Sequence, residues 1–303
     1  MPSRREYLAV VGLGSLAGCL GGDESTPTEG DPTSTATATP VPTTTATASP
    51  ADPARVGESV TVNDVDVTLE SVAVQSSLAV VYTDSGDVIA NTDGRFVLAE
   101  IDAGSPAPNA DQYTLVTAGE RGQPMEPGYG FWLSEDGRRE QYSADSASGT
   151  GGGWLAFPVD GGVDVQSARI TVGTGAWTLP DRVGERLSQP APRYEIGSFD
   201  HPETVTPDEP FSVSLTVENV GSVAGTFRGV LNVRGVEYAV YPYPIRLELD
   251  PGETEIWTKE YGPDEGLNDV GETGGFDLRT PAGDREDEIE VIAGTAVGTA
   301  TES

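Results

Sequence analysis

Cys19 carries the only thiol of the chain, and the residues before it limit the chemistry that this thiol can do. Two adjacent arginines, Arg4 and Arg5, precede a short apolar run, and small residues end that run directly before the cysteine. A paired arginine, a short apolar segment and small residues before a cysteine are typical of an export signal. The pattern therefore predicts an export signal followed by a lipid-attachment site.

These residues resemble the signal of archaeal and bacterial lipoproteins exported by the twin-arginine route. Arg4-Arg5 followed by Tyr7 and Leu8 matches the recognition motif of that family, and Leu-Ala-Gly-Cys ending at Cys19 matches its lipobox. The resemblance implies removal of residues 1–18 and a two-chain lipid on Cys19, because one acyl chain gives only marginal membrane binding. The apolar run is too short to cross a bilayer core, which needs about 20 apolar residues. The alternative is an ordinary secretory signal in which the cysteine is incidental.

Acidic residues dominate the rest of the chain. The formal net charge is −32 over 303 residues, with a single lysine. This composition resembles that of proteins from extreme halophiles, in which molar salt shortens the Debye length to about 3 Å and screens the carboxylates. We therefore expect the folded part to loosen when salt is removed. The alternative is an acidic surface that recruits a cationic ligand or a metal. No nucleic-acid partner is expected, because phosphates require a basic footprint.

Catalytic groups are poorly represented. His201 is the only histidine, and the chain has no Gly-x-Ser-x-Gly elbow and no second thiol with which a base could form a triad. Blue-copper halocyanins resemble this chain in signal and stalk, but copper needs two histidines and a thiolate. A carboxylate pair of the glycosidase type stays open, since acidic residues are too abundant to be diagnostic. We expect no enzyme, no catalytic residue and no cofactor.

Two groups of acidic residues could in principle hold calcium through oxygen ligands from loops. Neither has the spaced Asp-x-Asp-x-Asp-Gly pattern of a calcium loop, so we expect no metal site and interpret both as solvated acidic turns. The groups are Asp64 with Asp66, and Asp264, Glu265 with Asp269.

Tyr238, Tyr241 and Tyr243 form the most plausible contact surface. Prolines follow two of these tyrosines, and prolines within a strand indicate a sheet edge where no ladder hydrogen bond is needed. Exposed tyrosines suit sugars or protein partners. The alternative is that the rings cover the rim of the core.

Residues 19–54 are rich in threonine, proline, alanine and acidic residues. Such a segment buries too little apolar surface to offset the entropy of ordering its backbone, so it is predicted to be a disordered stalk. Its threonines are hypothetical sites of O-glycosylation. The last residues, 294–303, are predicted to be a flexible tail. Because lipid consumes Cys19, no disulfide is available, and the remaining chain must fold around packed cores.

Residues 55–182 contain short stretches in which apolar and polar residues alternate, which predicts β-strands. An opening hairpin is expected around Asn63-Asp64, and no useful stretch has the spacing of an amphipathic helix. The order of these features resembles the small immunoglobulin-like domains of prokaryotic surface lipoproteins. The expected strands are Val60–Val62, Val65–Leu69, Leu78–Tyr82, Arg95–Ile101, Tyr113–Thr117, Tyr129–Leu133, Trp154–Val159 and Ala168–Val172.

Residues 183–192 are interpreted as a linker, and residues 193–293 as a second β-sandwich. Its clearest strand is Phe211–Glu218, in which apolar residues recur at every second position. Asn219 and Gly221 suit a turn with positive φ, and Pro251-Gly252 favours another. Together these residues resemble the cell-adhesion-related, CARDB-like immunoglobulin-like domain of surface proteins, a family without shared catalytic residues. The other expected strands are Phe227–Val233, Val236–Tyr241, Ile245–Leu249, Thr254–Tyr261 and Glu288–Ile292.

The sequence therefore predicts an all-β protein with two tandem immunoglobulin-like β-sandwich domains after a signal peptide and a stalk. We expect it on the extracellular face of the cell membrane, held by lipid on Cys19, where it acts as a non-catalytic binding, adhesion or envelope-structural module. Its expected partners are cell-envelope proteins or glycans. The alternatives are an accessory subunit of an exported enzyme complex and a cation- or carbohydrate-binding surface protein.

Overall fold

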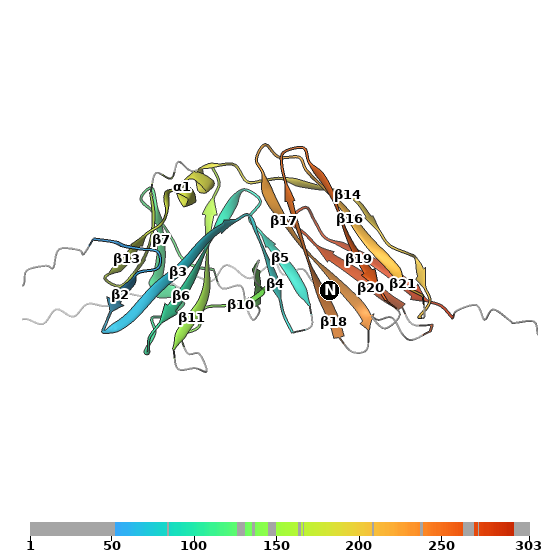
Figure 1. Cartoon of the computed structure of the whole chain (residues 1–303), viewed down its shortest axis with the longest axis horizontal. Coiled ribbons are helices and arrows are strands. Elements are labelled where there is room, and N and C mark those ends of the chain that lie inside the picture. The colour runs from blue at the N-terminus through green and yellow to red at the C-terminus, as the bar shows by residue number, and fades with distance from the viewer. Residues whose placement is uncertain are drawn as a thin grey trace, which may run out of the picture. The chain divides into compact units, whose positions relative to one another are not determined.

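The computed structural model describes residues 52–83, 85–125, 131–134, 137–144, 150–162, 165, 167–207, 209–236, 239–262, 270–271 and 273–293. These residues belong to one compact unit, 49–303. They form five β-sheets, one α-helix and one short 3-10 helix, η1 (Ala110–Gln112), so the fold is all-β as predicted (Figure 1). The proposed division of this unit into two domains stays a prediction.

Sheets A and B face one another in the N-terminal half. The strands of sheet A are, in order, β1 (Ala54–Arg55), β13 (Gly175–Thr178), β12 (Ala168–Val172), β7 (Tyr113–Thr117) and β8 (Glu120–Gly122). Those of sheet B are β11 (Gly151–Asp160), β6 (Gly94–Ala103), β3 (Val65–Gln75) and β2 (Ser59–Val62). The pairs are antiparallel except β1 with β13.

The predicted opening hairpin is confirmed as β2 and β3. Asn63 and Asp64 connect the two strands with φ angles of 50° and 66°. A two-residue hairpin turn of this kind needs positive φ at both positions, and asparagine and aspartate tolerate it better than other non-glycine residues. The turn chemistry therefore sets the register of β3.

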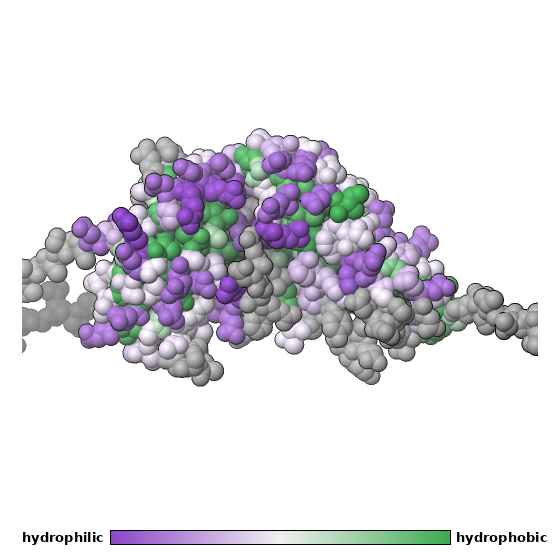
Figure 2. All heavy atoms as spheres, in the orientation of Figure 1, coloured by the Kyte–Doolittle hydropathy of each residue, from purple (hydrophilic) through white to green (hydrophobic). Residues whose placement is uncertain are grey.

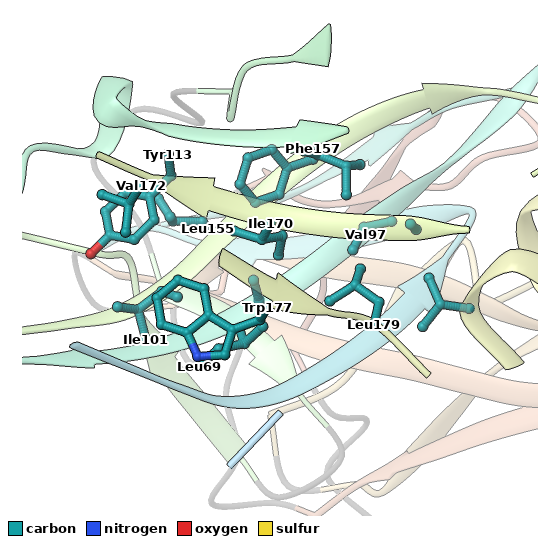
Figure 3. Close-up of a cluster of buried hydrophobic side chains, with 14 of the residues drawn as sticks. Leu69, Val97, Ile101, Tyr113, Leu155, Phe157, Ile170, Val172, Trp177 and Leu179 are labelled. Atoms are coloured by element: carbon teal, nitrogen blue, oxygen red, sulfur yellow. The ribbon is translucent and has the colours of Figure 1, made fainter. Parts of the chain in front are cut away.

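The core between sheets A and B surrounds Trp177, which is fully buried (Figure 3). Leu69 and Ile101 from sheet B lie beside its ring, and Ile170 and Tyr113 come from sheet A. The Trp177 Nε1–H donates to the Glu58 carbonyl at 2.8 Å, so the one polar atom of the indole is satisfied inside an apolar cluster.

Sheet B is buried on both faces. Val97 and Ala99 of β6 point into the core shared with sheet A, whereas the alternating Phe96 and Leu98 join a second core. That second core lies between sheet B and sheet C, which contributes Leu78. The strands of sheet C are, in order, β10 (Gly137–Glu140), β9 (Phe131–Ser134), β4 (Ser77–Val81) and β5 (Gly86–Ala90). Strands buried on both sides explain the nearly continuous apolar stretches in β4 and β6.

The segment interpreted as a linker contains a helix, and the expectation of no helix was wrong there. Helix α1 (Asp181–Ser188) buries Val183, Gly184 and Leu187, and the two larger side chains join the core of sheets A and B. An eight-residue helix shows only one i, i+4 apolar pair, which is too little periodicity to recognise from sequence.

Sheets D and E form the C-terminal half (Figure 1). Sheet D contains β14 (Tyr194–Asp200), β16 (Phe211–Asn219) and β19 (Thr254–Tyr261), and sheet E contains β15 (Thr204–Val205), β21 (Arg285–Val291), β20 (Thr273–Arg279), β17 (Gly225–Val236) and β18 (Ala239–Leu249). The predicted alternation in β16 is confirmed, because Val213, Leu215 and Val217 are all fully buried in the core between these sheets.

Asn219 ends β16 in extended backbone, and Gly221 has no positive φ either, so the prediction of a positive-φ turn at these two residues was wrong. The buried side chain of Asn219 instead donates to the carbonyls of Val223 and Leu249 and accepts from the Gly221 N–H. Glycine is needed at 221 for close approach, since a Cβ there would lie 2.8 Å from a backbone nitrogen. The second turn is confirmed, with φ of +79° at Gly252.

Sheet C also packs against sheet E. Ala79 and Val81 alternate with the residues of the second core and are themselves buried, and β4 and β5 contact β17. Val230 of β17 is fully buried, although it lies outside the core of sheets D and E. Packing is therefore continuous from the N-terminal sheets into the C-terminal sheets.

Candidate contact surface

All residues of the predicted signal, 1–18, and the lipid-attachment residue after it lie outside the described part of the chain. Arg4, Arg5 and Cys19 are among them, so export and lipid attachment stay predictions. Tyr238 also lies outside, and Tyr241 is placed only by its strand position in β18, opposite Val233.

Tyr243 is the tyrosine of the predicted surface whose side chain the structure describes. It is half-buried and packs against the core of sheets D and E. Its ring meets the Tyr261 ring edge-on, with 5.7 Å between ring centroids and an angle of 85°. This position at the rim of the core leaves part of the ring facing outward.

Lys259, which was not among the predicted contact residues, completes this cluster. Its ammonium lies 5.0 Å from the Tyr243 ring centroid and 5.1 Å from that of Tyr261. A cation over two aromatic faces is attracted by the ring quadrupoles. The cluster of Tyr243, Lys259 and Tyr261, hereafter the Tyr–Lys cluster, therefore fixes one positive charge on a strongly acidic protein. Its signal in the sequence was the single lysine of the chain, two residues before a tyrosine.

The Tyr–Lys cluster lies on two sheet edges. β18 is the last strand of sheet E, and Pro242 and Pro244 pair with Asn232 and Val230 of its one neighbour. Proline is tolerated there because an edge strand needs ladder hydrogen bonds on one side only. β19 is the last strand of sheet D, where Ile256 is 63% exposed. Figure 2 shows hydrophilic, intermediate and hydrophobic residues mixed on the visible face, with the hydrophobic residues in separate patches.

Behind Tyr243, aromatic rings continue into the core. Tyr261 stacks on Phe211 with 4.8 Å between centroids, and both rings pack against Phe276. Phe276 in turn packs against the His201 ring, with 5.2 Å between the ring centroids. The outer tyrosine therefore rests on a buried support, which holds its side chain with little conformational freedom.

His201 is built into this support. Its ring also packs against Phe199 at 5.2 Å, its Nδ1 lies 3.1 Å from the Pro202 carbonyl, and its Nε2 lies 3.4 Å from an Asp287 carboxylate oxygen. Both ring nitrogens therefore face groups of the protein itself, and this arrangement is typical of a histidine with a structural role.

The candidate calcium ligands are only partly described. Asp64 occupies the β2–β3 turn, and Asp66 accepts a hydrogen bond from Thr61 at 2.9 Å. Asp264, Glu265 and Asp269 lie outside the described residues. Within the described part, no group of three or more histidine, cysteine or acidic residues is placed to hold a metal ion.

A tyrosine pair lies in the N-terminal half, with Tyr113 fully buried and Tyr142 half-buried against the same core. The Tyr142 hydroxyl donates to the Pro108 carbonyl at 2.6 Å and lies 3.1 Å from the Tyr113 hydroxyl. Burial raises the pKa of both hydroxyls, so both stay protonated at neutral pH. The pair is a neutral hydrogen-bonded element of the core.

Among the described residues, no helix has both the length and the apolar character to span a bilayer.

Comparison with known proteins gave only partial likenesses. No protein-family model and no curated protein matches the sequence. A β-glucosidase from Listeria innocua aligns with a TM-score of 0.30 and 15% identity over 35% of this chain, which spans 17% of the enzyme. A CARDB domain from Pyrococcus furiosus, solved with di-metal ions, aligns with a TM-score of 0.28 and 11% identity over 34% of this chain and 96% of that domain. A solved CARDB domain is thus among the structures that this chain resembles in part.

Proposed function

We propose that this protein is an extracellular lipoprotein, held to the membrane by lipid on Cys19, that acts as a non-catalytic binding, adhesion or envelope-structural module in a halophile. The continuous packing of sheets B, C and E supports this proposal most directly. Such packing makes a stiff body, and a stiff body on a polar stalk can present a surface at a distance from the membrane.

The proposed contact surface is the Tyr–Lys cluster together with Tyr238 and Tyr241. Tyrosine offers a large, partly polar contact area at a low cost in conformational entropy, which suits a glycan or a protein partner. The ammonium of Lys259, placed over two rings, favours a partner that presents carboxylates or other acceptors, as acidic envelope components do.

Membrane attachment is tested by replacing Cys19 with serine and fractionating the cells. We expect the Cys19→Ser protein to leave the membrane fraction, and we expect the double change of Arg4 and Arg5 to lysine to leave unprocessed protein inside the cell. Retention of the serine variant in membranes would contradict the lipid anchor. Normal export of the lysine variant would contradict the twin-arginine route.

Partner binding is tested by recovering the protein from solubilised envelopes at high salt. The parent should retain an envelope protein or glycan, Lys259→Met should retain less, and Lys259→Arg should retain as much as the parent because it keeps the cation. Equal recovery of the partner with all three proteins would show that the Tyr–Lys cluster is not part of the contact surface. Turnover of envelope glycans by the purified protein would favour the alternative, an accessory subunit of an exported enzyme complex.

A further inference from the structure

Three arginines lie in one row across the outer face of sheet A. Each residue of the row is paired directly with the next one in the strand register, in the order Arg55 (β1), Thr178 (β13), Arg169 (β12), Val116 (β7) and Arg121 (β8). Directly paired residues point to the same face of a sheet. This face points away from the core, because the neighbouring residues along the strands, Trp177, Ile170 and Leu115, are buried.

The arginines of this row are exposed and evenly spaced. One strand separates β1 from β12, and one strand separates β12 from β8. Neighbouring strands lie about 4.8 Å apart, so the Cα atoms of successive arginines are about 10 Å apart. Arg55, Arg169 and Arg121, hereafter the arginine row, therefore present three positive charges at a regular interval along one line.

The arginine row has no acidic partner among the described residues, where none of its guanidinium groups forms an ion pair. The Glu58 carboxylate accepts instead from the Arg55 backbone N–H at 2.8 Å. Glu120 pairs with the buried Thr117 and so lies on the opposite face of the sheet. The remaining outward-facing residues at paired positions of sheet A are Thr114, Thr171 and Ala176. The paired positions of this face thus carry no carboxylate, in a chain whose net charge is −32.

A pocket of about 550 Å³ opens on the same face and is lined by Arg169 at the centre of the row. Val116 and Ala118 give the pocket an apolar side, and Ser167 and Thr178 contribute hydroxyl-bearing residues. A small number of polar groups beside apolar ones is the usual lining of a ligand site. Such a lining suits a sugar ring, which has apolar C–H faces and a rim of hydroxyls.

We propose that the outer face of sheet A binds an acidic glycan in which every second sugar carries a carboxylate. The carboxylates bind the arginine row, and the neutral sugar between two of them lies in the pocket beside Arg169. Arginine binds a carboxylate through a planar fork of two hydrogen bonds. At molar salt the Debye length is about 3 Å, so the negative charge of the rest of the protein does not repel the glycan from a distance.

This inference adds a second surface and the chemical class of its ligand to the proposed function. It depends neither on the lipid anchor nor on the Tyr–Lys cluster, which belongs to sheets D and E.

The test uses short hyaluronan oligosaccharides, which carry one carboxylate on every second sugar, as a fluorescent probe. Anisotropy in molar potassium chloride should show saturable binding to the protein, and labelled dextran, which is uncharged, should not bind. Arg169→Gln should weaken hyaluronan binding roughly tenfold, because it removes one charge-assisted contact. Arg169→Lys should recover only part of the loss, because an ammonium cannot form the planar fork.

Arg285→Gln is the matched control. Arg285 is an exposed arginine of β21 in sheet E, and its replacement removes the same charge from another face. This variant should bind hyaluronan like the parent. Thermal melts of all these variants should match that of the parent, since each replaced side chain is exposed.

Equal hyaluronan affinity in Arg169→Gln and the parent would overturn the proposal, as would hyaluronan binding no tighter than that of dextran. Binding of polyglutamate or of phosphatidylglycerol vesicles without binding of hyaluronan would also overturn it, because the face would then take an acidic peptide or a lipid surface. Hyaluronan binding that is lost in Lys259→Met but kept in Arg169→Gln would assign the glycan to the Tyr–Lys cluster instead.

Discussion

The side-chain amide of Asn232 binds both backbone groups of Gly86, a residue 146 positions away in sequence. Asn232 Oδ1 accepts from the Gly86 N–H at 2.7 Å, and its Nδ2 donates to the Gly86 carbonyl at 2.8 Å. Asn232 is 3% exposed. The amide therefore pairs with the backbone N–H and C=O of Gly86 at the edge strand β5, as a neighbouring strand would do. This pairing lies where sheet C packs against sheet E.

Replacing Asn232 with alanine should lower the free energy of unfolding by about 2 to 4 kcal/mol, because two buried backbone groups lose their partners. Fluorine NMR of protein labelled with 5-fluorotryptophan measures this in denaturant, since Trp177 reports on the N-terminal sheets and Trp257 on sheet D. In the parent we expect one common midpoint, and in Asn232→Ala two separate ones.

Asn91→Ala is the matched control. Its Nδ2 also makes two hydrogen bonds, both partly buried, to the carbonyls of Arg95 and Val159, but both partners lie in the N-terminal sheets. We expect it to lower stability without separating the two transitions. If Asn232→Ala keeps the parent's single midpoint, Asn232 does not join the two sets of sheets.

Gly86 itself should tolerate no side chain. A Cβ there would lie 2.5 Å from Val230 Cγ1 and 3.1 Å from Pro242 Cβ, so Gly86→Ala should cost about 1 to 3 kcal/mol through overpacking. Val230→Ala removes the closest of these atoms. A double-mutant cycle measured by denaturant unfolding should therefore show that the two changes together cost less than their sum. Simple additivity would mean that Gly86 and Val230 do not touch in solution.

Replacing Asn219 should destabilise the protein about as much as replacing Asn232, but all of its hydrogen-bond partners lie in the C-terminal half. Its amide nitrogen donates to two carbonyls, at 2.9 Å and 3.0 Å, and its oxygen accepts from the Gly221 N–H. Asn219→Ala should lower the unfolding free energy by about 2 to 4 kcal/mol. Asn219→Asp keeps the acceptor but presents oxygen to two carbonyls, so it should recover none of the loss at neutral pH. A stable aspartate variant would show that the acceptor alone holds the turn.

Alkaline pH should destabilise the protein through Tyr194. Burial raises the pKa of its hydroxyl to about 12 in the folded protein, against about 10 in the unfolded chain. The unfolded state therefore loses the proton first, and the stability that is present below pH 10 is lost as the pH rises towards 12. Tyr194→Phe keeps the ring packed edge-on against Phe227 and removes the titrating group. Denaturant unfolding between pH 9 and 12 should show a shallower loss in this variant, and parallel losses would contradict the assignment.

Local sequence pattern was sufficient to predict strands with one buried face and two tight turns. Alternation located β16, and Asn63-Asp64 located the first hairpin, because both features depend on neighbours along the chain. The strands that were missed have weak local signals. β20 contains Gly274-Gly275, and β5 begins at Gly86, and glycine is depleted in strands.

For the candidate sites, residue type pointed to tyrosines on an edge strand, and β18 is indeed at the edge of sheet E. Sequence could not pair Tyr243 with Lys259, which belongs to another sheet. Such groups meet only when separate elements have packed.

The sequence by itself determined the all-β character of the chain, because a period of two records which side of a strand is buried. It also carries the predictions for Cys19, since a leader and its cysteine are adjacent in the chain. Only the tertiary structure decided that β4 and β6 are buried on both faces and that Asn232 closes the edge of β5. Whether a strand buries its second face, and which distant polar groups pair, depends on which sheets pack together. Local periodicity along the chain carries no information about that packing.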